Sequence, residues 1–167
     1  MKSLERGFTL IELIIYIAIV AIILTSLIPF AWNVIEGGAK SATEQEVFAN
    51  ARYVSERIKY EIRNASGINS VSATSISLSE TSGAVNPTVI DLSSSNIRIT
   101  QGAGSPINLN SSNTTISGLT FTNYTSGDNK TKNIQFTFTV NASFNGSARQ
   151  EFTESTTIEG DAEVRSN

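Results

Sequence analysis

An apolar run with a glutamate at its start constrains this chain more than any other feature. The run extends from Leu13 to Phe30, and its only polar members are Tyr16, Thr25 and Ser26. About 20 apolar residues in a helix span a bilayer, so the segment is long enough to be a membrane helix. Glu12 directly precedes the run, and a charge near the bilayer centre costs about 2.5–3.5 kcal/mol. Because the run contains no cation to pair with Glu12, we expect this carboxylate to have a function beyond packing.

Two simpler interpretations of this segment leave residues unexplained. A secretory signal peptide has an apolar core of about 7–15 residues followed by a cleavage site of small residues. The run here is longer, begins beside a carboxylate and shows no convincing site of that kind. A plain membrane anchor fits the length of the run but gives no reason for Glu12 or for the residues before it.

The residues around the start of the run resemble the N-terminal signal of type IV prepilins and type II secretion pseudopilins. A short leader with cations at Lys2 and Arg6 ends at Gly7, and the five residues from Phe8 to Glu12 read Phe-Thr-Leu-Ile-Glu. The resemblance implies that a prepilin peptidase cuts between Gly7 and Phe8. It also implies that the same enzyme methylates the new amino group of Phe8.

The same resemblance implies the partners and the location of the chain. Glu12 and Thr9 become residues of filament assembly, with other pilin or pseudopilin subunits and the inner-membrane assembly platform as partners. The lipid bilayer holds the helix before assembly. Since cations mark the cytoplasmic end of a membrane helix, Lys2 and Arg6 place the leader in the cytoplasm and the C-terminus outside it. We expect a single-pass protein of the cytoplasmic (inner) membrane that joins a cell-surface or periplasmic filament after assembly.

The segment after the apolar run contains helix-weakening residues. Pro29 removes one helical hydrogen bond, and many pilins carry a proline at this place. Gly37 and Gly38 each weaken a helix by about 1 kcal/mol. We expect a kink or a short melted segment between Pro29 and Gly38. Such a segment could unwind in a packed filament, as in related pilin filaments, or serve as a simple hinge between membrane helix and head.

A second helical pattern follows the glycine pair. Ser41 or Thr43 is expected to restart the helix, with Glu44 or Glu46 completing a capping box, and Gly67 is interpreted as its stop. Apolar residues then recur with the period of one helical face at Val47, Ala51, Val54, Ile58, Ile62 and Ala65.

The opposite face of this second helix is charged. We expect it to be solvated or to face neighbouring subunits, and it carries Arg52, Glu56, Arg57, Lys59, Glu61 and Arg63. The stretches Asn50–Tyr53 and Ile58–Ala65 are similar to the stalk helix of W-type minor pilins and J-type pseudopilins. Glu61 stands where that pattern usually has an aspartate.

The chain after Ser70 alternates apolar with serine, threonine and asparagine residues, which is typical of β-strands. About five to seven short antiparallel strands are expected, at Ser75–Leu78, Thr88–Leu92, Ile97–Ile99, Ile107–Leu109 and Ile116–Thr122, with Leu119 and Phe121 inward, and beyond. The clearest alternation is Ile134, Phe136, Phe138, Val140, Ala142 and Phe144. It leads into Asn145-Gly146, a strong hairpin signal, with a return strand from about Arg149 to Ile158.

These patterns predict an α+β fold. A long N-terminal helix, transmembrane in its first half and amphipathic in its second, packs on an antiparallel β-sheet head, as in type IV pilins. The expected segments are a leader at residues 1–7, a transmembrane and filament-core helix at 8–36, a hinge and amphipathic stalk helix at 37–66, and the head at 67–167.

The composition excludes several kinds of chemistry. The chain has no cysteine and no histidine, so it lacks disulfides, thiol chemistry and the commonest general base. Asp128-Asn129-Lys130 lacks the spaced oxygen ligands of a calcium loop, and we expect neither a metal nor a cofactor. The formal net charge of −3 argues against non-specific nucleic-acid binding, which requires a basic patch.

Two classes of function remain. The first is a structural subunit, a minor pilin or pseudopilin, that joins a pilus-like or type II secretion filament through its N-terminal helix. The second is a membrane-anchored binding protein or adhesin that uses a pilin-like anchor. An anchored enzyme is poorly supported, because no nucleophile–base set stands out.

Overall fold

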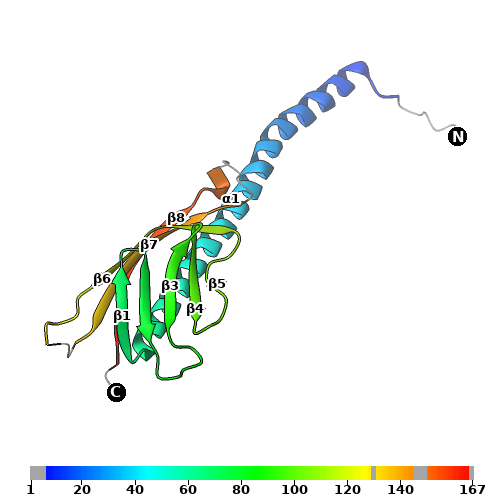
Figure 1. The fold of residues 1–167 in the computed structure, drawn as a ribbon. Coiled ribbons are helices and arrows are strands. Elements are labelled where there is room, and N and C mark those ends of the chain that lie inside the picture. The colour runs from blue at the N-terminus through cyan, green and yellow to red at the C-terminus, as the bar shows by residue number, and fades with distance from the viewer. Residues whose placement is uncertain (1–6, 129–130, 145–149, 166–167) are drawn as a thin grey trace. The chain divides into compact units, whose positions relative to one another are not determined.

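The computed structural model describes residues 7–128, 131–144 and 150–165 (Figure 1). The chain divides into two compact units, Met1–Ala39 and Lys40–Asn167. The helix α1, Leu10–Asn64, begins in the first unit and ends in the second. The described strands all belong to the second unit.

The first unit contains the membrane-length part of α1. Among the described residues, α1 alone is long and apolar enough to cross a bilayer, and its most apolar stretch is unburied within the chain. The hydroxyls of Thr25 and Ser26 donate to carbonyls one turn back, Thr25 to Ile22 O at 2.8 Å and Ser26 to Ile23 O at 3.0 Å. These two hydroxyls are thus satisfied inside the helix, as a bilayer requires.

The helix is continuous through Pro29, Gly37 and Gly38. The predicted melted segment is therefore wrong, and so is the predicted helix restart at Ser41 or Thr43, where Thr43 lies buried in mid-helix. Once a helix is nucleated, each added residue costs little, so two glycines at about 1 kcal/mol each do not interrupt 55 residues of helix. A kink at these positions remains a prediction.

In the second unit, α1 buries the predicted apolar stripe. Val47, Ala51, Val54, Ile58 and Ile62 are fully buried, and Ala65, just beyond the helix, is 2% exposed. The assignment of Glu61 to the exposed charged face is wrong, because Glu61 is only 4% exposed. The buried face of α1 is therefore wider than the stripe of apolar residues.

Sheet A is a five-stranded antiparallel sheet in the order β1-β2-β3-β4-β5. Its inward residues face one another in register, with Ile76 opposite Ile90 and Ile90 opposite Ile99. The strand β1 was not predicted, because Gly67 was interpreted as the stop of the helix. The helix already ends at Asn64, and Gly67 is the first residue of β1. The other four strands of this sheet lie where strands were expected. The strands are β1 Gly67–Ser72, β2 Ser75–Ser79, β3 Thr88–Ser93, β4 Asn96–Gln101 and β5 Ile107–Asn108.

Sheet B contains β6 Thr114–Asn123, β7 Asn133–Ala142 and β8 Ser155–Glu163, with β7 in the centre. The alternation of β7 is confirmed. Its inward residues are fully buried: Ile134, Phe136, Phe138 and Val140. In β6, Leu119 and Phe121 are inward as predicted, 2% and 4% exposed, beside a bulge that includes Gly118 at a φ of 64°.

Two expectations for the end of sheet B are wrong. Phe144 lies beyond β7, is half-buried, and its ring contacts that of Phe152 at a centroid distance of 5.6 Å. A short 3-10 helix, η1 Gln150–Phe152, precedes β8, which starts at Ser155 and not near Arg149. The Asn145-Gly146 turn lies outside the described residues.

One core joins the buried stripe of α1 to the inward faces of both sheets. Figure 1 shows the C-terminal part of α1 lying along the strands of the head. Gly160 of β8 permits a close approach, since a Cβ atom there would lie 2.6 Å from the Phe136 ring and 3.1 Å from Lys59 Cε. The α+β class, with a long apolar N-terminal helix against antiparallel sheets, is confirmed.

Candidate processing and assembly site

The first turn of α1 is closed by a reciprocal pair of side chains. Thr9 directly precedes the helix, and Glu12 is its third residue. The Thr9 N–H and the Thr9 hydroxyl both donate to Glu12 Oε2 at 2.9 Å, and the Glu12 N–H donates to Thr9 Oγ1 at 3.3 Å. This is a capping box, in which residues at the helix start satisfy each other's backbone donors.

The capping box corrects what the sequence predicted for Glu12. The sequence indicated no partner for Glu12, whereas Thr9 donates two hydrogen bonds to its carboxylate. The signal was present as Thr-x-x-Glu directly before an apolar run, a pattern typical of helix starts. The same pattern at Ser41 and Thr43 lies in mid-helix and does not begin a helix. Capping gives Glu12 a structural role in addition to any role in assembly.

Gly7 and Phe8 precede the helix in an open conformation. A Cβ atom on Gly7 would meet no atom within 4 Å, and the backbone there is outside the left-handed region. The chain itself therefore does not require a glycine at this position. Phe8 is 76% exposed, and its ring lies 5.7 Å from that of Tyr16. The Gly7–Phe8 bond is thus accessible to an enzyme from outside the chain.

The capping box holds a carboxylate close to the expected cleavage point. Glu12 Oε2 accepts from the N–H of Thr9, the residue that follows Phe8. The leader cations Lys2 and Arg6 lie outside the described residues. The described part of this site brings together Thr9 and Glu12, while Pro29, Gly37 and Gly38 lie further along the same helix.

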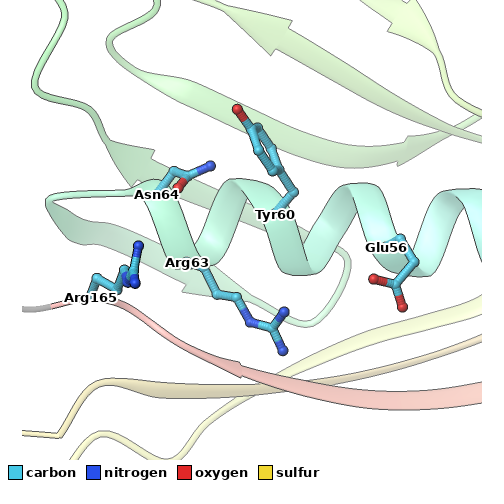
Figure 2. A pocket seen from close by; sticks show the side chains of 5 residues that line it. All are labelled: Glu56, Tyr60, Arg63, Asn64 and Arg165. Atoms are coloured by element: carbon cyan, nitrogen blue, oxygen red, sulfur yellow. The ribbon is translucent and has the colours of Figure 1, made fainter.

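A second polar site lies at the other end of α1. It is an open pocket whose lining residues Figure 2 shows: Glu56, Tyr60, Arg63, Asn64 and Arg165. Glu56 accepts a hydrogen bond from Lys59 at 3.3 Å, and in Figure 2 the Tyr60 side chain points away from the Arg63 guanidinium. These side chains do not assemble a nucleophile with a base. The described residues also hold no group of three or more carboxylate, histidine or cysteine side chains placed to bind a metal.

Comparison with known protein families identifies the N-terminal segment. Residues 2–28 match the model of the prokaryotic N-terminal methylation motif. The matched residues include the capping box and most of the apolar run. No curated protein and no solved structure gives a significant match to the chain. The match therefore concerns the processing and membrane segment.

Proposed function

Because residues 2–28 carry the N-terminal methylation motif of type IV prepilins and pseudopilins, we propose that the chain is a filament subunit, a minor pilin or a pseudopilin. It would belong to a type IV pilus-like or type II secretion filament. The motif implies processing by a prepilin peptidase and assembly with other pilins. The observation that carries the proposal is the capped carboxylate of Glu12 one turn from an accessible Gly7–Phe8 bond.

Processing requires a substrate that the peptidase can approach. Gly7 has open space around it, and Phe8 is exposed. The chain does not need a glycine here for its own conformation. A peptidase that must bring the backbone close to its catalytic groups does need one, because glycine has no side chain. Cleavage after Gly7 then frees the amino group of Phe8, the site of methylation.

Assembly uses the new amino group. In the bilayer and in the filament core, the Glu12 carboxylate pairs with the amino group of Phe8, its own or that of a neighbouring subunit. Leaving one partner of a buried ion pair alone costs about 3–5 kcal/mol. Thr9 keeps the Glu12 carboxylate beside the helix start until the amino group pairs with it.

Before assembly, the long apolar helix anchors the subunit in the membrane, with the head outside the cytoplasm. The assembly platform binds the subunit there. The head acts by contact with other subunits and not by catalysis.

Two substitutions at Glu12 separate its charge from its capping role. Glutamine can also close a capping box, so Glu12→Gln keeps the cap and removes the charge, whereas Glu12→Val removes both. We expect both variants to be cleaved, as read by mass spectrometry, and both to be depleted from sheared filaments relative to wild type.

The outcomes of this experiment point to different conclusions. Normal assembly of Glu12→Val overturns the pairing of Glu12 with the amino terminus. Normal assembly of Glu12→Gln alone shows that the cap matters and the charge does not. An intact Met1 in cells with an active prepilin peptidase would overturn the whole proposal. Full surface function of a chain that is not cleaved would favour the membrane-anchored adhesin.

A further inference from the structure

The core-facing rows of sheet B turn polar at one end of the sheet. Along β7 the inward residues start at Ile134, and Lys132 stands two residues before it. Along β6, the inward Phe121 is followed at the same spacing by Asn123 and Thr125. Residues two apart on a strand share a face. An ammonium, an amide and a hydroxyl therefore continue the apolar rows at the end where Asn123 pairs with Ile134.

Backbone hydrogen bonds extend sheet B past these strand ends. The Tyr124 N–H donates to Asn133 O at 2.9 Å, which continues the pairing of β6 with β7. The Val164 N–H donates to Lys132 O at 2.9 Å, which continues the pairing of β7 with β8. The polar end of the sheet is thus built on a hydrogen-bonded backbone.

Strand β1 of sheet A contacts β6. It is an edge strand, and a bulge interrupts its pairing with β2 between Ile68 and Ser70. The bulge places Ile68 and Val71, three residues apart, on the same face, opposite the buried Leu78 and Ile76. Bulges occur often at sheet edges and beside functional sites, where they re-aim a side chain.

A cavity of about 160 Å³ lies between β1 and the polar end of sheet B. Two apolar side chains of β1 line it together with amides, a hydroxyl and one cation, and these residues are Ile68, Asn69, Val71, Asn123, Thr125 and Lys132. Among the described residues, no carboxylate lines this cavity. The positive charge of its single lysine therefore has no counter-charge in the lining.

Two polar groups of the cavity lack a partner in the described part of the chain. Thr125 Oγ1 is buried and makes no hydrogen bond, although the Thr125 N–H donates to Asn123 Oδ1 at 2.9 Å. The half-buried Lys132 forms no ion pair with any described residue. Residues 66–79, which include β1 and β2, contain no charged side chain. Native proteins leave few such polar groups, so each needs a physical explanation.

The chemistry of the lining indicates the kind of ligand. A single lysine is a point charge that suits a single negative charge such as a carboxylate. Amides and hydroxyls both donate and accept hydrogen bonds, as sugar hydroxyls do. Ile68 and Val71 offer an apolar surface to the carbon face of a ring. An engineered cavity of about 150 Å³ in another protein binds benzene, so the cavity here has room for one six-membered ring.

We propose that this cavity binds a sugar acid, a six-membered sugar ring that carries a carboxylate. Lys132 pairs with the carboxylate, Asn69 and Asn123 hydrogen-bond to the hydroxyls of the sugar, and Ile68 and Val71 contact the ring carbons. This binding is a further function of the head, and it does not depend on assembly into a filament.

The test titrates the full chain in detergent with three hexuronates: galacturonate, glucuronate and mannuronate. Acetate and galactose are the matched probes, since acetate lacks the ring and galactose lacks the charge. NMR chemical shifts of Asn69, Thr125 and Lys132 report binding at the cavity. At least one hexuronate should bind with a Kd on the order of 1 mM, as a ligand of this size allows. Acetate and galactose should bind about tenfold more weakly or less, because each loses part of the contacts.

Two variants place the ligand in the cavity. Lys132→Met keeps most of the aliphatic stem and removes the charge, so hexuronate binding should weaken about tenfold or more. Asn69→Ala, at an exposed position of the bulge, should weaken binding as well. Lys40→Met, at an exposed position of α1, is the matched control and should bind as wild type does. The Tm of each variant shows whether it is folded.

Each outcome decides for or against the sugar acid. If none of the three hexuronates shifts the cavity resonances, the cavity holds water alone and the proposal is overturned. Acetate or galactose that binds as tightly as the best hexuronate also overturns it. Wild-type affinity of a folded Lys132→Met or Asn69→Ala chain has the same consequence. Glu12→Val should bind the hexuronate normally whether or not it assembles, so this proposal and the proposed function fail separately.

Discussion

At the scale of single residues, the Glu12 carboxylate has an observed structural role and a second, proposed role in assembly. Glu12 closes the first turn of α1 through Thr9, and under the proposed function it later pairs with the amino group of Phe8. The two roles are compatible because both place the partner at the helix start. The positive end of the helix dipole also favours a negative charge there. A membrane helix thus tolerates Glu12 before assembly without a cation in the apolar run.

Gly7 is expected to matter to the peptidase and not to the fold. Gly7→Ala adds a methyl group in open space, so the helix and membrane insertion should be unchanged. Cleavage should be partial at most, and a bulkier residue at this position should abolish it, because the enzyme needs close approach to the backbone. Mass spectrometry reads the mature end, which should be N-methylated Phe8. Complete cleavage of a Gly7→Leu chain would contradict this account.

At the scale of elements, the contact between β8 and α1 depends on one missing side chain. At Gly160, an added Cβ would lie 2.6 Å from the ring of Phe136, which is fully buried and cannot move aside freely. The stem of Lys59 lies on the same spot, 3.1 Å away. The strand β8 therefore packs closely on α1 because Gly160 has no side chain.

Gly160→Ala is expected to destabilise the head by about 1–3 kcal/mol through overpacking. The measurement is the free energy of unfolding in denaturant. Gly83→Ala is the matched control, since a Cβ there meets no atom within 4 Å. Equal stability of the two variants would show that β8 shifts at little cost.

At the scale of the whole molecule, the unit Lys40–Asn167 has its own core. The stripe of α1 and the inward residues of both sheets belong to one buried cluster. The part of α1 in the other unit contributes no buried residue to it. This separation suits a subunit whose N-terminal helix serves the membrane and the filament.

A fragment from about Ser41 to Asn167 should therefore be soluble and folded without the membrane segment. Ile58→Asp buries an unpaired charge at a fully buried position and should unfold the fragment. Circular dichroism and amide proton dispersion in NMR read both results. Arg52→Asp, at an exposed position of the same helix, is the control and should stay folded.

The same fragment tests the minor-subunit part of the proposal. It should bind the heads of co-encoded minor subunits more readily than itself, measured by analytical ultracentrifugation of mixtures. Strong self-association with no affinity for those heads would favour a major subunit.

Local patterns determined much of this protein from sequence alone. The membrane helix, the motif around Gly7, Phe8 and Glu12, the buried stripe of α1 and the alternation of β7 all follow from residue periodicity or short spacing. Such signals depend on neighbours in the chain, so no tertiary knowledge is needed to read them. The capping box of Thr9 and Glu12 was equally local and could have been found.

Other features were decided by tertiary structure. Glu61 lies at the border of the helix stripe and is 4% exposed, and residue periodicity alone does not determine that this border is buried. Phe144 continues the alternation of β7 yet leaves the core, because the strand ends at Ala142. Residue periodicity sets which face a side chain takes, whereas burial depends on which distant element covers that face.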